Sequence, residues 1–144
     1  MVNALKEMWR VLRADGVLLD IRPIAARWPL EVLVNDVWES AGRFDDSPSL
    51  PDDEASDRAL VTAARDGWFV REHDAIFQLF CYWDSLDDMQ AYIAERWAPS
   101  VVLPDAVLDT AKRLSTEKGA RVRGLLTMSI SRWKKVNGRA RGAQ

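Results

Sequence analysis

Charged and aromatic side chains beside two apolar stretches are the ones best suited to chemistry. Asp20 and Arg22 stand two residues apart near the end of the first stretch, so on a strand they share one face. Arg71 to Asp74 precede the second stretch, and His73 beside these carboxylates could accept a proton. Ligands often bind at the carboxyl ends of strands in α/β sheets. The candidate pocket for a small molecule therefore comprises Asp20, Arg22, His73 and Trp83.

Both groups of charged residues also have a structural explanation. Asp20 and Arg22 could form ion pairs with the rest of the sheet or with Arg10, and this explanation is favoured. Charged residues just before a strand often belong to a solvated turn. No catalytic or cofactor-binding residue is assigned on this basis.

The single cysteine, Cys81, excludes an internal disulfide and a thiolate metal cluster. It lies eight residues after His73, so a pair of nucleophile and base stays open. A buried cysteine that acts as a small hydrophobic residue is the favoured alternative. We expect no metal site, because one histidine and one cysteine cannot supply a zinc site.

Seven tryptophans are many for a chain of 144 residues. Their indoles could line a pocket for a flat or apolar ligand, form an interface, or simply fill the core. Core filling is slightly favoured. Those near expected element ends are Trp28, Trp38, Trp68, Trp83 and Trp97.

Composition indicates a folded protein of ordinary type. Hydrophobic residues make up 48% and charged residues 29%, and the length suits one domain with one core. We expect that domain over residues 1–136, followed by a flexible basic tail over 137–144. The net charge of -2 gives no general attraction to nucleic acid or to an anionic membrane, and no apolar run approaches the ~20 residues that span a bilayer. We therefore expect a soluble, cytoplasmic protein with neither nucleic-acid nor membrane partners.

Apolar periodicity predicts a sheet with several helices. Helical spacing and stop signals predict helices over 2–12, 53–66, 85–98 and 104–118. The first helix ends in a turn in which Gly16 would take a positive φ. Strands are predicted over 17–22, 30–35, 38–44, 76–83 and 122–133, with the second and third forming a hairpin.

Three further expectations follow from these elements. Residues 45–53, rich in Asp, Ser and Pro, are expected to form a surface loop. The nearly continuous apolar run 76–83 predicts a central strand covered on both faces. In 122–133, Ile130 is expected on the same face as Val122, with Ser131 opposite. The predicted fold class is α+β, with a five-stranded, mainly antiparallel sheet and about four helices.

The run Ala4-Leu5-Lys6-Glu7-Met8-Trp9-Arg10-Val11-Leu12-Arg13-Ala14-Asp15-Gly16-Val17-Leu18-Leu19-Asp20-Ile21-Arg22-Pro23 resembles a late segment of class I S-adenosylmethionine-dependent methyltransferases. In that family a helix ending in a basic-Val-Leu-basic-Pro-Gly-Gly turn leads into the fifth sheet strand. Here Ala14-Asp15-Gly16 replaces Pro-Gly-Gly. The close match covers about twenty residues, and the rest is similar only in the order of elements. The resemblance implies the C-terminal half of a methyltransferase type 11-like fold, and a sheet that is the remnant of a doubly wound ancestor.

The resemblance also implies what this chain lacks. In the family, the residues that hold the cofactor precede the matching segment, and the isolated glycines at 67, 119 and 138 restore no glycine-rich turn. We therefore expect no bound cofactor, no autonomous methyltransferase activity, and a role as a binding or assembly module. The alternatives are the C-terminal part of a split methyltransferase, or a methyltransferase-related enzyme acting on a small molecule.

The lost neighbouring strands imply an open edge. In the complete fold another strand flanks the one equivalent to 17–22, and its absence leaves backbone groups unpaired. The 30–44 hairpin could fold back to cover this edge, or a second copy could pair with it. We expect a homodimer, or a complex with a separate cofactor-binding chain.

Overall fold

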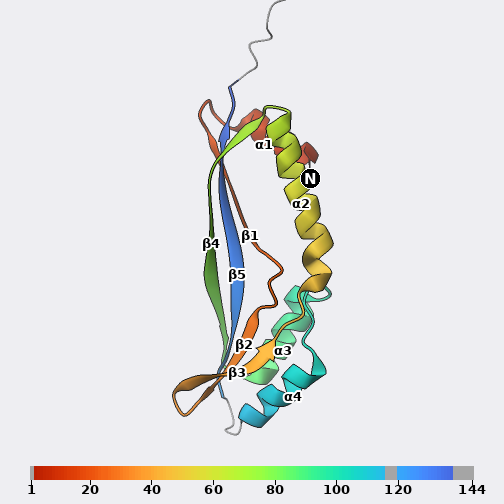
Figure 1. Cartoon of the computed structure of the whole chain (residues 1–144), viewed down its shortest axis with the longest axis vertical. Coiled ribbons are helices and arrows are strands. Elements are labelled where there is room, and N and C mark those ends of the chain that lie inside the picture. The colour runs from red at the N-terminus through yellow and green to blue at the C-terminus, as the bar shows by residue number, and fades with distance from the viewer. Residues whose placement is uncertain (1, 116–119, 138–144) are drawn as a thin grey trace, which may run out of the picture. The chain divides into compact units, whose positions relative to one another are not determined.

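The computed structural model describes residues 2–115 and 120–137, and its α+β class confirms the predicted fold class. The described part contains four α-helices and a five-stranded antiparallel sheet (Figure 1). Its elements are α1 (Val2–Val11), β1 (Val17–Pro23), β2 (Pro29–Val34), β3 (Val37–Arg43), α2 (Leu50–Arg65), β4 (Phe69–Trp83), α3 (Leu86–Tyr92), α4 (Asp105–Leu114) and β5 (Val122–Lys135). Residues 116–118 of the helix expected over 104–118 lie outside the described residues.

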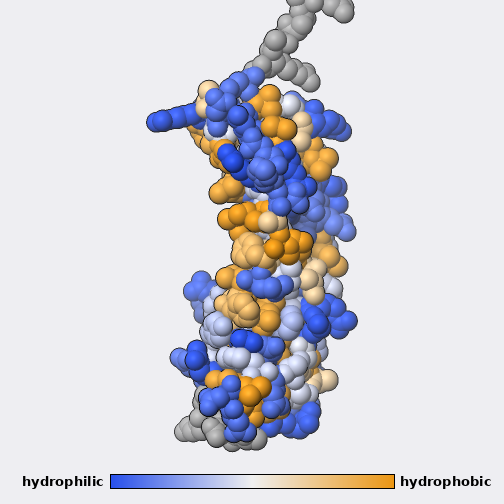
Figure 2. Space-filling model, turned by 60° about the vertical axis from the view of Figure 1, so that its left-hand side comes forward, coloured by the Kyte–Doolittle hydropathy of each residue, from blue (hydrophilic) through white to orange (hydrophobic). Residues whose placement is uncertain are grey.

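β5 lies at the centre of the sheet. The strand order is β1-β5-β2-β3, and β4 pairs with β5 as well. The expectation of a central strand over 76–83 is therefore wrong, because β4 pairs with β5 alone and Ile76 is 67% exposed. Exposed apolar residues are visible on the molecular surface (Figure 2). A continuous apolar run predicts burial on both faces, but it does not reveal whether partner strands and helices are present.

The chain forms two compact units. The described residues of the first unit lie within Met1–Arg22, Pro51–Phe77 and Ser129–Gln144, and those of the second within Pro23–Leu50 and Gln78–Met128. Each unit has its own cluster of buried side chains, where the sequence analysis expected one core. The division into a domain over 1–136 and a tail over 137–144 stays a prediction, and residues 138–144 lie outside the described ones.

Small residues on α2 let the first unit close against its strands. Ala59, Leu60 and Ala63 of α2 are buried together with Leu5 of α1 and with two aromatic residues of the strands. Leu18 of β1 packs against this cluster, whereas Leu19 is 55% exposed. Neighbouring residues of a strand point to opposite faces. The two helices therefore cover one face of the first unit's strands and leave the other face open.

The ends of the described chain meet in the first unit. The indole N–H of Trp9 donates to the carbonyl of Val136 (3.1 Å), and Lys135 Nζ donates to the carbonyl of Leu12 (2.6 Å). The ammonium of Lys135 also lies 5.0 Å from the centre of the Trp9 ring. α1 is thus fastened to the last strand.

The turn after α1 differs from the expectation in one respect. The positive φ of 61° belongs to Asp15 and not to Gly16. Gly16 is needed for a different reason: a Cβ there would lie 2.8 Å from the carbonyl oxygen of Arg13. Close backbone approach therefore selects glycine at this position.

The hairpin of the second unit forms as predicted. Asn35 and Asp36 have φ values of 47° and 64°, which suits a two-residue turn between β2 and β3. α4 approaches β3 so closely that a Cβ on Gly42 would lie 2.8 Å from the Val107 side chain. Ser85 caps α3 at the start of the helix expected over 85–98, since its side chain accepts a hydrogen bond from the Asp88 N–H (3.1 Å). Local sequence signals were sufficient for the hairpin and for the start of α3, but not for the contact between α4 and Gly42.

The predicted surface loop over 45–53 is wrong at Asp46. This residue is 1% exposed, and its carboxylate accepts hydrogen bonds from the backbone N–H groups of Ala26 (2.8 Å) and Arg27 (2.9 Å). A short 3-10 helix, Ser47–Ser49, follows, and α2 already begins at Leu50. The partners of Asp46 lie about twenty residues earlier in the chain, so the local composition gives no sign of its burial.

The face of β5 that is buried changes along the strand. Val122, Leu126 and Met128 are buried as predicted, but Ser131 is buried and Ile130 is only half-buried. By strand alternation Ile130 shares the face of Val122 and Ser131 lies on the opposite face, as expected; the burial of Ser131 was not predicted. Ser131 accepts a hydrogen bond from the indole N–H of Trp133 (2.8 Å), and this bond satisfies its buried hydroxyl.

Replacing Asp46 with alanine should lower the free energy of unfolding by about 2–3 kcal/mol, because two backbone N–H groups lose the buried charged acceptor that holds them. Urea denaturation followed by circular dichroism measures this change. Asp109→Ala, at an exposed position of α4 in the same unit, is the matched control and should stay within about 0.5 kcal/mol of the wild type. Equal losses in both variants would contradict the role assigned to Asp46.

Candidate functional site

Asp20 and Arg22 form an ion pair on the face of β1 that α2 covers. Arg22 Nε lies 3.2 Å from Asp20 Oδ2, and the guanidinium also donates to the Asp53 carbonyl (3.1 Å) and to the Asp57 carboxylate. Burial alone would lower the pKa of Arg22, but the hydrogen bond to Asp57 and the nearby acidic groups outweigh it, so the pKa is raised. The guanidinium stays charged and fastens β1 to α2. Arg10 pairs with Glu7 instead.

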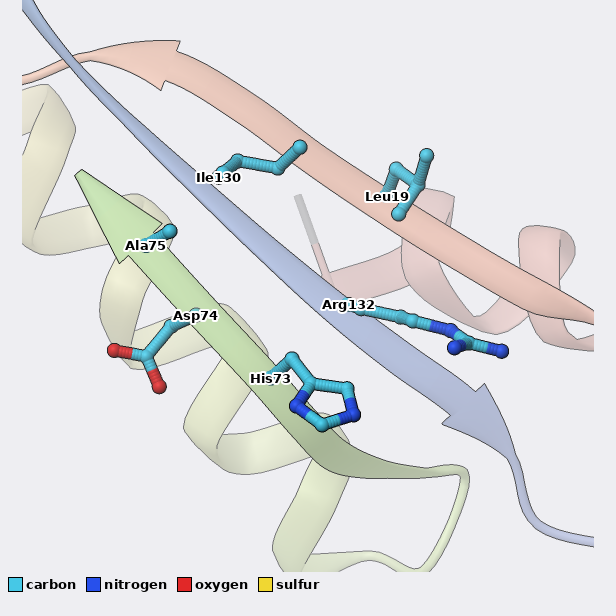
Figure 3. A pocket seen from close by; sticks show the side chains of 6 residues that line it. All are labelled: Leu19, His73, Asp74, Ala75, Ile130 and Arg132. Atoms are coloured by element: carbon cyan, nitrogen blue, oxygen red, sulfur yellow. The ribbon is translucent and has the colours of Figure 1, made fainter. Parts of the chain in front are cut away.

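His73 lies on the other side of the first unit's strands, in a shallow hollow of about 220 Å³. Figure 3 shows Leu19 on β1, Ile130 and Arg132 on β5, and His73 on β4 around this hollow. The carboxylate of Asp74 points away from His73 (Figure 3) and pairs with Arg71 at 3.4 Å.

The lining of the hollow is almost entirely apolar, and it includes the side chains of Leu19, Ala75 and Ile130. Arg132 is held by Glu72, with Nε and Oε2 3.2 Å apart. Leu19 lines the hollow and Asp20 faces α2, so the Asp20–Arg22 pair and His73 lie on opposite faces of the first unit's strands.

Trp83 belongs to the core of the second unit. It is 9% exposed, and its ring centre lies 5.7 Å from those of Trp97 and Tyr92. Of the four candidate pocket residues, Asp20 and Arg22 are the two that the structure brings into direct contact. Trp83 packs in a different unit from the other three.

Most of the tryptophans singled out from the sequence fill cores. Trp28 is buried, Trp97 packs edge-on against it with ring centres 5.8 Å apart, and Trp68 packs against the first unit's cluster. Trp38 differs, because it stands on β3 beside Tyr82 at 5.9 Å. The core-filling interpretation is therefore confirmed for all five but Trp38.

A stacked arginine on the second unit was missed by the sequence analysis. The guanidinium of Arg123 lies 4.3 Å from the Trp38 ring centre and 5.2 Å from that of Phe80, and its Nε is 2.6 Å from Glu31 Oε2. Glu31 and Arg123 are direct neighbours in the pairing of β2 with β5. The opposite charges on two predicted strands were a possible signal, but only the strand order pairs them. With its charge satisfied and its plane stacked, Arg123 acts here as a structural residue.

Cys81 is a half-buried cysteine that packs against the core of the second unit, and burial raises the pKa of its thiol. A raised pKa leaves less thiolate, the reactive form, at neutral pH. His73 lies in the first unit, so the structure gives no support to a pair of nucleophile and base. Within residues 2–115 and 120–137 there is no group of three or more His, Cys, Asp or Glu that could hold a metal ion.

Comparison with known proteins gives no relative. No protein-family model matches the chain, and no curated protein or solved structure does so either. The resemblance to methyltransferases accordingly stays a prediction. No helix in the described part of the chain is long and apolar enough to cross a membrane.

Cys81 should react slowly with iodoacetamide at pH 8, because burial disfavours its thiolate. Mass spectrometry of the native protein over time measures the rate, which should be about tenfold or more below that of the same protein in denaturant. Labelling as fast as in the unfolded chain would show that the thiol is exposed or activated.

Arg22→Ala should destabilise the protein by roughly 1–2 kcal/mol, since Asp20 loses its partner and α2 loses its fastening to β1. Chemical denaturation measures the change. Arg58→Ala is the control, because its ion pair with Glu54 is about two-thirds exposed on both sides and should contribute under about 0.5 kcal/mol. If both variants lose the same stability, the fastening role is excluded.

Proposed function

We propose that this protein is a methyltransferase-like binding or assembly module, related to the C-terminal half of class I methyltransferases and without methyltransferase activity of its own. The observation that carries the proposal is the edge of β1, which pairs with β5 on one side and with no strand of the described chain on the other. We further propose a cytoplasmic location.

The hairpin does not cover this edge. β2 pairs with β3 and with β5, in an antiparallel register that includes Leu30 opposite Gly124. Leu19 and Ile21 on β1 stay 55% and 53% exposed. Unpaired backbone groups beside exposed apolar side chains are typical of surfaces that bind another strand.

The charged side chains near the edge already have partners. Arg22 is bound by Asp20 and Asp57, Arg132 by Glu72, and Asp74 by Arg71. Arrangements of this kind stabilise the fold and do not prepare a proton transfer. They support a role in binding over a role in catalysis.

The hollow beside His73 favours a second candidate function. Its almost entirely apolar lining would suit a small apolar molecule. The protein would then be a methyltransferase-related enzyme that binds a small molecule in this hollow. It could also be the C-terminal part of a split methyltransferase, completed by a separate cofactor-binding chain. A ligand whose affinity falls in His73→Ala and Arg132→Ala variants would favour this alternative.

Purified protein should show no saturable binding of S-adenosylmethionine in titration calorimetry, because the sequence has no glycine-rich turn and no ribose-binding carboxylate after a first strand. A complete class I methyltransferase titrated in parallel provides the positive control. Saturable binding at micromolar concentration by this chain alone would remove the proposal.

A further inference from the structure

The free edge of β1 has the shape and chemistry of a self-pairing strand. We propose that a second copy of this chain pairs with β1 in an antiparallel direction, about a two-fold axis at Leu19, so that the two sheets become continuous. The inference rests on the proposed function, because it names the partner that the assembly module takes.

Backbone hydrogen bonds show which groups of β1 face outward. The carbonyl of Gly16 accepts from the Lys135 N–H (2.8 Å), and the N–H of Ile24 donates to the Thr127 carbonyl (3.0 Å). From the first bond to the second, each strand advances by eight residues, so no bulge interrupts the pairing. Residues with even numbers therefore bond to β5. The N–H and C=O groups of the odd-numbered residues Val17, Leu19 and Ile21 point to the free edge.

The side chains of these odd-numbered residues form an apolar row. Leu19 lines the open hollow and is 55% exposed, and Ile21, on the same face, is 53% exposed. The charged residues of the strand, Asp20 and Arg22, lie on the opposite face and neutralise each other. A partner strand therefore meets no unpaired charge along this edge.

The position of the axis follows from exclusion. In a two-fold antiparallel pair, the residue on the axis faces its own copy. An axis at Asp20 would set two carboxylates opposite each other, and one at Arg22 would do the same with two guanidinium groups, both unfavourable. An axis at Ile21 would set Pro23, which has no N–H, opposite Leu19.

An axis at Leu19 avoids these conflicts. Val17 of each copy then faces Ile21 of the other, and Leu18 faces Asp20, so no like charges meet. An axis nearer Val17 would extend the pairing into the turn at Asp15, where φ is 61°. Only in this register does the apolar row of one copy face the apolar row of the other. We therefore take the partner strand to be β1 of a second copy of the chain.

The other free edge, on β4, fits a partner strand less well. Its first half carries four successive polar or charged residues, Arg71 to Asp74, and such residues protect an edge from pairing. Val17, Leu19 and Ile21 lack this protection.

The test places charges on the proposed axis. Light scattering of the wild type at low micromolar concentration should give the mass of two chains. Leu19→Lys should give one chain, because two ammonium groups would face each other. An equimolar mixture of Leu19→Lys and Leu19→Glu should return to two chains, since opposite charges then meet on the axis. The control is Ile76→Lys, which places the same charge on the exposed β4 and should leave two chains.

Several results would overturn the inference. The first is a wild-type mass of one chain, and the second is a Leu19→Lys variant that keeps the mass of two chains. The third is a mixture that does not reassociate although circular dichroism shows both variants folded. The fourth is dissociation of the dimer by Ile76→Lys. A wild type of two chains that Leu19→Lys leaves intact would place the interface elsewhere and leave the proposed function standing. The calorimetric titration with S-adenosylmethionine tests that function separately.

Discussion

β5 supplies backbone hydrogen bonds to three of the four other strands, β1, β2 and β4, and β3 is held only through β2. Each of these pairings joins segments far apart in sequence, except for the β2–β3 hairpin. β5 also contributes to both cores: Val122, Leu126 and Met128 belong to one, and Trp133 belongs to the other. Pairing along β5 is thus the condition under which either cluster can exclude water.

The central position of β5 decides where the sheet ends. Because β5 accepts neighbours on both sides, β1 and β4 each keep one unpaired row of N–H and C=O groups. Such rows are costly to bury without a partner and easy to extend with one. The helices of the first unit cover neither this edge nor the whole of β1. α1 and α2 pack on the face that carries Leu18 and leave Leu19, on the other face, exposed. β1 therefore has both an unpaired edge and an exposed apolar face.

The sequence predicted the elements well where the signal is local. The hairpin follows from two strand-like runs only a few residues apart, although its turn lies at Asn35 and Asp36. The start of α3 follows from Ser85 three residues before Asp88. Prediction failed where the deciding partner is distant. Asp46 is buried because Ala26 and Arg27 present N–H groups to it, and an aspartate in a Ser/Pro-rich segment gives no hint of them.

The candidate site shows the same division. The favoured interpretation was that Asp20 and Arg22 form ion pairs with the rest of the sheet or with Arg10. Alternation along a strand was enough to place them on one face, but it did not predict that they pair with each other. Asp57, which completes that pair, lies 35 residues from Arg22 and could not be assigned without the fold. Trp83 ended an apolar run that suggested a pocket wall, yet edge-on contacts with other aromatic rings bury it.

The fastening of α1 to β5 has a consequence for synthesis on the ribosome. β1 finds its strand partner more than a hundred residues later, because Gly16 bonds to Lys135 and Trp9 to Val136. Domains commonly acquire structure from the N-terminus as the chain emerges, but this unit has nothing to close upon until its last strand is made. Until β5 has been made, Leu5 and Leu18 lack the strand partner that completes their buried cluster and stay in contact with water.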